Sequence, residues 1–405
     1  MATSPHAEQL THPTEPFLQN KDIAVISMSD WEGPKRIRQY LSEELARRGN
    51  RVLFVESQYT LSKFFKKPSL SKAFRFLKGP RRLAENLFLL TTIPFIPGGE
   101  FSSLIARINW NVERTFLRGA MKRLGFKAPL LWLFAYNARP LIGKTGESFA
   151  LYFCNDAFSL LVSSRSLQQR VALMEQDTLK HVDVVFTVSE PLSEEKAQLH
   201  SSVHTVHHGV DLQAFQNPAA NVRPTDVPSA SPVIGYSGVI RYMIDLDMLA
   251  FIADRQPQWS IVLVGPVAES GAEFYSKIQQ LKQRPNIHFL GPKRPEDLPA
   301  YINTFDVCLL PYVQGEISRY YAAPLKFYEY LAAGRPVVST VGPRIEDREV
   351  VINCASREDV LSAIHEALAQ NPAAAAKRKA IAARNSWTQR VQQIDDILSR
   401  LPKRK

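Results

Sequence analysis

The sequence predicts an α/β protein built from two doubly wound domains, each with a largely parallel sheet. Its 405 residues are enough for two domains of ordinary size. Short apolar runs typical of buried strands alternate with amphipathic helical patterns in both halves of the chain. A Pro-, Ala- and Ser-rich stretch without periodicity separates the halves. We therefore expect a disordered tail, a first domain, a linker, a second domain and a last helix, at 1–20, 21–215, 216–232, 233–385 and 386–405.

Composition narrows the class of protein and of its partners. The chain is 45% hydrophobic and 22% charged, which is typical of a soluble globular protein. Its net charge of +11 favours anionic partners such as nucleotide phosphates, anionic lipids or nucleic acid. No apolar run reaches the roughly 18 residues needed to span a bilayer, and the N-terminus lacks the pattern of a secretory signal. Three cysteines without metal-ligand spacing indicate reduced thiols in a cytosolic protein: Cys154, Cys308 and Cys354.

The first domain opens with a predicted strand, helix and strand at 23–27, 34–48 and 52–55. Gly33 lies in the loop after the first strand, where a glycine lets a ligand approach the backbone. The G-x-G-x-x-G pattern of dinucleotide-binding proteins does not occur here. Gly33 is therefore a candidate phosphate or acceptor contact resting on a weak signal.

A basic and aromatic stretch follows at 62–90, and a second basic and apolar run at 105–126 extends the same character. Basic residues attract anionic lipids while aromatic side chains enter the membrane interface, so we expect contact with a membrane surface. The alternatives are a helix that packs on its own domain, or a mobile lid. No nucleic-acid-binding motif accompanies the charges, and nucleic acid is not expected as a partner. The candidate membrane contacts are Lys63, Phe64, Phe65, Lys66, Lys67, Lys72, Phe74, Arg75, Phe76 and Lys78.

Asp156 is the candidate catalytic carboxylate. It comes directly after a predicted strand at 149–154, and another strand precedes that one at 130–134. Ligands bind at the carboxyl ends of parallel strands, which is where this side chain would lie. A carboxylate in such a crevice can take a proton from a substrate hydroxyl. The alternative is a helix N-cap or a loop carboxylate.

The rest of the first domain and most of the second continue the alternation. Predicted elements are a helix at 166–180, strands at 182–189 and 203–210, then strands at 233–236, 260–264, 287–290 and 307–310 with helices between them. His207 and His208 are neighbours whose side chains would point to opposite faces, so we interpret them as structural. Asp245 and Asp247 fall at a helix start and are interpreted as capping residues.

The most informative stretch is PYVQGEISRYYAAPLKFYEYLAAGRPVVST at 311–340. Pro324 suits the start of a helix and Gly334 its end. Lys326 falls in the first turn, where free backbone N–H groups favour anions, and Glu329 follows three residues later. Amides and a lysine could hold a diphosphate while the glutamate accepts hydrogen bonds from a ribose. The alternative is an amphipathic helix with solvated charges.

The segment PLKFYEYLAAGRPVV resembles the nucleotide-binding signature of GT-B glycosyltransferases of group 1. It is similar to that of bacterial enzymes that build surface polysaccharides such as teichuronic acid or xanthan. The resemblance runs from about residue 23 to the last helix, and TVHHGVDLQAF is similar to the turn that closes the first domain of this family. It implies two Rossmann-like domains facing across a cleft, with the last helix crossing back to the first domain.

The resemblance also implies a site and a reaction. A nucleotide sugar, expected to be a UDP-sugar, would bind the second domain through Gly238, Arg241, Gly265, Lys293, Tyr312, Lys326 and Glu329. Gly33 would approach the transferred group, and Asp156 would deprotonate the acceptor hydroxyl. No metal or other cofactor is implied. The acceptor would be a lipid-linked saccharide at the inner face of the cell membrane, which places the protein in the cytoplasm as a peripheral membrane protein.

Two departures from the larger retaining family favour inversion of the anomeric centre. Only Arg241 is basic after the Gly238 loop, where that family has an arginine and a lysine. Tyr321 stands where it has a glutamate. The alternatives are a retaining enzyme acting on a soluble or glycolipid acceptor, a sugar-nucleotide epimerase of the same fold, and a non-catalytic sugar-nucleotide-binding protein.

Overall fold

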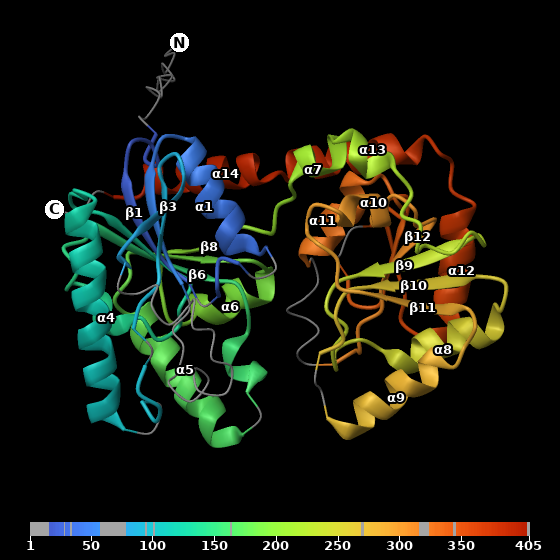
Figure 1. Ribbon diagram of the computed structural model, residues 1–405, viewed down its shortest axis with the longest axis horizontal. Helices are drawn as coiled ribbons and strands as arrows, with labels where there is room; N and C mark the ends of the chain where they lie inside the picture. The colour runs from blue at the N-terminus through green and yellow to red at the C-terminus, as the bar shows by residue number, and fades with distance from the viewer. Residues whose placement is uncertain are drawn as a thin grey trace, which may run out of the picture.

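The computed structural model describes residues 16–27, 29–32, 35–56, 78–93, 95–99, 102–162, 164–268, 271–315, 324–342 and 346–402. Two α/β domains lie side by side and are joined along one end of the molecule (Figure 1). Gly33, Tyr321 and all but one of the candidate membrane contacts lie outside the described residues. The exception, Lys78, is exposed.

The first domain is an eight-stranded sheet in the order β3-β4-β2-β1-β5-β6-β7-β8. All of its pairings are parallel except β3 with β4. Helices lie on both faces, because the apolar strands of a parallel sheet must be covered on each side. The strands are β1 (Asp22–Ile26), β2 (Arg51–Val55), β3 (Arg81–Ala84), β4 (Leu87–Leu90), β5 (Leu130–Leu133), β6 (Phe149–Cys154), β7 (Val184–Thr187) and β8 (Val203–Thr205). The helices are α1 (Ile37–Arg47), α4 (Ser103–Arg123), α5 (Arg165–Leu179) and α6 (Glu190–Ala197), with 3₁₀ turns η2 (Arg139–Leu141) and η3 (Phe158–Leu161). The next two elements, α7 (Leu212–Gln216) and η4 (Pro218–Asn221), pack on the core of the second domain.

The antiparallel hairpin at one edge of this sheet is not expected from the sequence. Residues 81–90 fall in the stretch that the sequence analysis assigns to a basic, aromatic surface, yet they form β3, a turn with Asn86 at φ 60°, and β4. Leu87 and Leu89 of β4 are buried, whereas Arg81 and Arg82 of β3 are exposed. Charged residues on an edge strand discourage pairing with another chain, and this explains why the strand lacks an apolar pattern.

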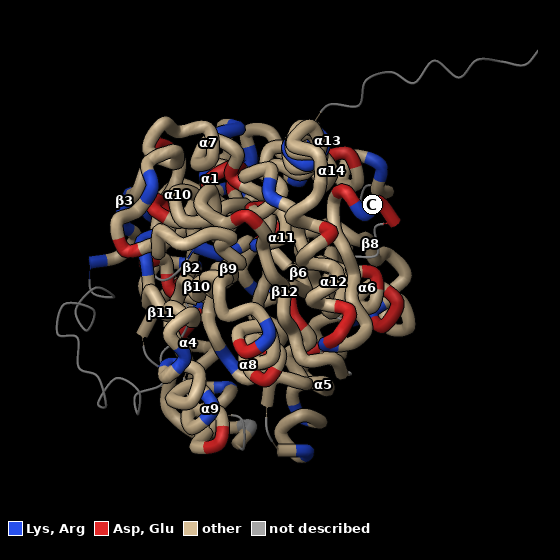
Figure 2. Tube along the Cα trace, turned by 90° about the vertical axis from the view of Figure 1, so that its right-hand side faces the viewer, with Lys and Arg blue, Asp and Glu red and all other residues tan. Residues whose placement is uncertain are grey.

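Acidic and basic residues are interspersed over the face of the molecule that the second domain presents in Figure 2.

The second domain is a six-stranded, fully parallel sheet in the order β11-β10-β9-β12-β13-β14. Its strands are β9 (Val233–Ser237), β10 (Ser260–Val264), β11 (Ile287–Gly291), β12 (Val307–Leu310), β13 (Val337–Ser339) and β14 (Val351–Asn353). Its helices are α8 (Leu246–Arg255), α9 (Ala272–Lys282), α10 (Leu298–Ile302), α11 (Leu325–Ala332), α12 (Arg357–Leu368) and α13 (Ala374–Arg384).

The last helix, α14 (Trp387–Arg400), leaves the second domain and packs on α1 of the first (Figure 1). Trp387 stacks on Tyr40 of α1 with ring centroids 5.2 Å apart, and Ile394 and Leu398 are buried in the core of the first domain. Among the described residues, no helix is both long and apolar enough to cross a membrane.

The prediction of a disordered tail at 1–20 includes residues that are packed against the first domain. Leu18 is buried, and its backbone N–H donates to the Asp395 carboxylate of α14 over 2.6 Å. Phe17 packs edge-on against Phe149 of β6, with ring centroids 5.4 Å apart. An aromatic and an aliphatic side chain at these positions are sufficient to anchor a segment that composition alone marks as polar.

Candidate active site

The first turn of α11 lies at the carboxyl ends of the strands of the second domain. Pro324 is the N-cap, in an extended conformation, and Gly334 follows the helix with φ 73°, as the left-handed end of a helix requires. Phe327, Tyr330 and Leu331 bury one face of the helix in the domain core. The opposite side of the helix carries Lys326 and Glu329, the two side chains singled out in the sequence.

Lys326 occupies an aromatic cradle. Its Nζ donates to the hydroxyl of Tyr312 over 2.9 Å and lies 4.9 Å from the centre of the Tyr236 ring. Burial alone would lower the pKa of Lys326, but the neighbouring Tyr236 and Tyr312 oxygens outweigh it and the pKa is raised. Lys326 is therefore positively charged at neutral pH and held in one place beside the helix N-terminus.

The backbones of Gly238 and Gly265 pack against each other next to this cation. A Cβ added at Gly238 would lie 2.9 Å from Nζ of Lys326, and one added at Gly265 would lie 2.1 Å from the Gly238 carbonyl oxygen. Both residues have positive φ, at 143° and 140°. The loops after β9 and β10 are thus in contact, and they lie so close to each other and to Lys326 that neither position has room for a Cβ.

Glu329 lies one turn after Lys326 in α11, and its pKa is raised. Burial raises its pKa to about 7, while Lys326 opposes the rise and Asp211 adds to it. Tyr40 of α1 is a neighbour of this carboxylate. Burial is the main cause of the raised pKa of Tyr40, and the charge of Glu329 is the second. Glu329 is therefore partly protonated at neutral pH and faces the first domain.

Asp156 follows β6 at the carboxyl end of the first sheet. Its Oδ1 accepts a hydrogen bond from the Ala157 backbone N–H over 3.1 Å. The adjacent Asn155 accepts from the buried Arg38 guanidinium over 3.0 Å. Burial lowers the pKa of Arg38 to about 10, with Arg36 contributing, while the charge of Asp156 acts against the decrease. A carboxylate and a buried cation therefore face each other at this edge.

Helix α1 connects the two halves of the candidate site. Arg38, in its first turn, reaches Asn155 and Asp156, and Tyr40, two residues on, reaches Glu329 and Trp387. Successive residues of a helix point in different directions, so one short helix contacts both elements. The sequence analysis missed Arg38; the only available signal was a basic residue at the start of the helix after the first strand.

His208 is a second residue that the sequence analysis did not assign to the site. Burial lowers its pKa to about 3, and His207, Arg390 and Lys326 act in the same direction. Its neighbour His207 lies on a different side, with Nε2 3.0 Å from a Glu190 carboxylate oxygen. Across the described residues, no group of three or more His, Cys, Asp or Glu side chains is arranged to hold a metal ion.

Lys293 and Arg241, the remaining candidate residues of the second domain, differ from each other in their surroundings. Lys293 donates to the Asp226 carboxylate over 2.6 Å and lies 5.0 Å from the centre of the Tyr301 ring, which ties the second domain to the linker. Arg241 is half-buried and its charge acts on the Tyr236 hydroxyl, so it lies on the same side as Lys326. The structure thus brings together Gly238, Arg241, Gly265, Tyr312, Lys326 and Glu329, and gives Lys293 a structural partner.

Comparison with known proteins identifies the architecture. Residues 232–370 match the family model described as glycosyl transferases group 1, and this range includes the whole α11 site. The chain has a GT-B fold, and its residues 232–370 are similar to a glycosyltransferase group 1 domain. Asp156 and Arg38 lie outside the matched range.

Individual relatives agree with this assignment. The chain is 30% identical over 201 residues to the putative teichuronic acid biosynthesis glycosyltransferase TuaH of Bacillus subtilis (strain 168), covering 47% of this chain and 50% of TuaH. It therefore spans about half the length of this curated relative. HepE of Anabaena, in complex with UDP and glucose, superposes with a TM-score of 0.63 at 14% identity, covering 94% of this chain and 99% of HepE. Sucrose-phosphate synthase of Thermosynechococcus elongatus superposes with a TM-score of 0.67 at 17% identity, covering 93% and 98%.

Proposed function

We propose that the chain is a glycosyltransferase that moves a sugar from a nucleotide diphosphate sugar to a hydroxyl of a lipid-linked saccharide. The observation that carries this proposal is the charged Lys326, fixed between two tyrosines beside the backbone of Gly238 and Gly265. A cation at a helix N-terminus next to a glycine loop suits a diphosphate. The match to group 1 glycosyltransferases over this part of the chain supports the same assignment.

The donor half would bind the nucleotide and stabilise the leaving group. Lys326, Arg241 and the N–H groups at the start of α11 would take up the negative charge that develops on the diphosphate, so the proposal includes no metal ion. Glu329 would accept hydrogen bonds from the ribose. UDP is the proposed nucleotide because HepE, which shares the fold, is described in complex with UDP.

The acceptor half would supply the base. The acceptor oxygen attacks the anomeric carbon, the bond from that carbon to the diphosphate oxygen breaks, and the hydroxyl proton passes to Asp156. One displacement of this kind inverts the anomeric centre. Arg38 would orient the Asn155–Asp156 loop through its hydrogen bond to Asn155.

The proposed setting is the cytoplasmic face of a membrane, in the synthesis of a surface polysaccharide. The named role of TuaH in teichuronic acid biosynthesis supports such a product. The basic helix α4 supports contact with an anionic surface, because it carries five Lys and Arg residues and one Glu over its 21 residues.

Calorimetric titration of the full chain with UDP tests the donor site. We expect Lys326→Met to weaken binding by about tenfold or more, because a charge-assisted contact to phosphate contributes about 1.5–3 kcal/mol. Lys282→Met removes a lysine at the end of α9 and should leave the affinity unchanged. A panel of UDP-sugars, assayed for UDP release with and without lipid-linked saccharide, then distinguishes a transferase from an epimerase. Equal UDP affinity of Lys326→Met and the unmodified chain would contradict the assignment.

A further inference from the structure

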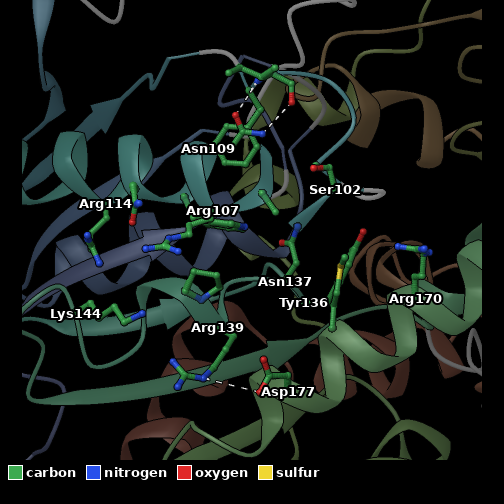
Figure 3. A pocket seen from close by; sticks show the side chains of 18 of the residues that line it. Ser102, Arg107, Asn109, Arg114, Tyr136, Asn137, Arg139, Lys144, Arg170 and Asp177 are labelled. Carbon is green, nitrogen blue, oxygen red and sulfur yellow. Dashed lines mark hydrogen bonds and ion pairs between the residues drawn. The ribbon is translucent and has the colours of Figure 1, made fainter. Parts of the chain in front are cut away.

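A cavity of about 1120 Å³ lies in the first domain between α4, α5 and the η2 loop (Figure 3). Arg107 and Arg114 enter it from α4, Arg139 and Lys144 from the η2 loop and the turn after it, and Arg170 from α5. Asp177 is the one acidic residue in its lining. Small-molecule sites are typically cavities of about 300–1,000 Å³, so this space is large enough for a sizeable ligand.

The lining of the cavity holds more cations than carboxylates. Within the described residues, no ion pair involves Arg107, Arg114 or Lys144, and Arg139 meets Asp177 at the 4.0 Å limit of an ion pair. Arg107, Arg114 and Lys144 share one concave space with Arg139, so these cations repel one another and attract an anion. Asn109 does not add to this attraction, because its side chain is bound to the Ile96 backbone at both ends, over 2.9 Å each.

The cavity opens at the same edge of the sheet as Asp156. Tyr136 and Asn137, in its wall, follow β5, and β5 is paired in parallel with β6, which precedes Asp156. The Tyr136 ring packs against Phe158, two residues after Asp156, with ring centroids 5.3 Å apart. The Tyr136 backbone carbonyl also accepts a hydrogen bond from Thr178 of α5 over 2.7 Å. A molecule anchored in the cavity would thus extend along the wall that leads to the proposed base.

The surroundings of the cavity are apolar. Of the eleven large hydrophobic side chains exposed among the described residues, four lie on its wall or on the helices that form it: Ile96, Leu104, Ile108 and Leu173. Leu104 and Leu173 are the most exposed of the four, at 65% and 63%. Exposed apolar residues around a charged pocket are typical of sites that receive an amphipathic ligand.

We propose that this cavity binds the phosphate groups of the lipid-linked acceptor, with the apolar residues around it in contact with the lipid. The inference rests on the proposed function and locates its acceptor site. A diphosphate ester is a compact dianion that several arginines can grip at once, each through paired N–H groups. The same cations could bind a free phosphoanion or an anionic membrane phospholipid, so the test must separate three sources of phosphate.

Vesicle sedimentation of the full chain provides this test. Zwitterionic phosphatidylcholine vesicles would contain either a long-chain isoprenyl diphosphate or phosphatidylglycerol at equal total charge. We expect binding to the diphosphate vesicles to be about tenfold tighter or more, and inorganic pyrophosphate to compete with it. Arg107→Gln combined with Arg114→Gln should abolish the preference. Arg118→Gln combined with Lys122→Gln removes equal charge from the same helix outside the cavity and should retain it.

Three results would overturn the proposal. Equal binding to both kinds of vesicle would mean that α4 recognises only an anionic surface. Tight binding of pyrophosphate without a preference for the diphosphate lipid would mean a site for a free phosphoanion. An unchanged preference in the Arg107/Arg114 double variant would place the lipid elsewhere. UDP calorimetry on the same variants checks their folding, and a chain that binds no UDP would refute the proposed donor chemistry without altering the vesicle result.

Discussion

Glu329, a residue of the proposed donor site, has a cost in stability that depends on pH. Its carboxyl is half-buried beside Lys326 and Asp211, and burial raises its pKa from 4.5 to about 7. Between these two pH values the folded chain holds a proton that the unfolded chain has released. Stability therefore decreases as the pH rises through this window, and above it the fold must accommodate an ionised carboxylate.

Glu329→Gln should relieve this cost. We expect the substitution to raise the free energy of unfolding at pH 8 by about 1–3 kcal/mol, and to change it little at pH 4.5, where both forms of the protein are uncharged at this position. Donor affinity should fall at pH 8, because an amide accepts hydrogen bonds from ribose hydroxyls less strongly than a carboxylate. Urea denaturation at a series of pH values and UDP-sugar calorimetry measure the two effects. A stability difference that does not change with pH would show that Glu329 is not strained by burial.

At the scale of elements, a buried polar network supports the loop that carries Asp156. Glu175 of α5 receives hydrogen bonds from Tyr152 of β6 over 2.6 Å and from Lys196 of α6 over 2.8 Å. The Cys154 thiol lies 3.4 Å from the Glu175 carboxylate and 3.4 Å from the Asp156 carbonyl oxygen. The strand end is thus tied to both flanking helices through one carboxylate.

Glu175→Gln should leave the buried Lys196 charge without its buried partner, paired only with the more exposed Glu195. The Lys196 and Glu175 side chains are only 3% and 5% exposed, and removing one partner of a buried ion pair costs about 3–5 kcal/mol. We expect a loss of stability of that order in urea denaturation. Glu195→Gln is the matched control, because Glu195 also contacts Lys196, at 2.7 Å, but its side chain is 42% exposed. The control should lose less than about 1 kcal/mol. Similar losses in the two variants would mean that the buried Glu175–Lys196 pair stabilises the fold no more than the exposed contact does.

At the scale of the whole molecule, the two domains are held together along one end and meet at the site through α1. Trp387 at the start of α14 fills the space beside Gly209, where an added Cβ would lie 2.8 Å from its ring. The Arg390 guanidinium then donates to the His208 carbonyl over 3.1 Å and lies 5.7 Å from the Tyr328 ring of α11. The crossing helix thus fixes the turn between the domains next to the donor helix.

The sequence predicted those parts of the fold that depend on local signals. The parallel strands appear as short apolar runs because both faces of the sheet are covered, and Pro324 and Gly334 mark the ends of α11. The β3–β4 hairpin was missed because an edge strand with Arg81 and Arg82 has no such run.

The same limit applies to the site. Asp156 could be proposed because it follows a strand, and Lys326 because it lies in the first turn of a helix, both marked by local patterns. Glu329 could be proposed from its place one turn beyond Lys326. The contact of Lys293 with Asp226 could not be predicted, because Asp226 lies 67 residues away in the sequence. His208 was missed for a related reason, because its proximity to Lys326 arises only when the second domain folds back on the first.

The central claim is that the two facing domains form one transferase site, with Asp156 as the base. Its most direct test is the rate of UDP release from a UDP-sugar in the presence of lipid-linked saccharide, for the unmodified chain and for Asp156→Asn. We expect Asp156→Asn to lower turnover about a hundredfold or more, since general base catalysis contributes about 10²–10⁴-fold, while donor affinity stays within about twofold. Turnover close to that of the unmodified chain would contradict the account.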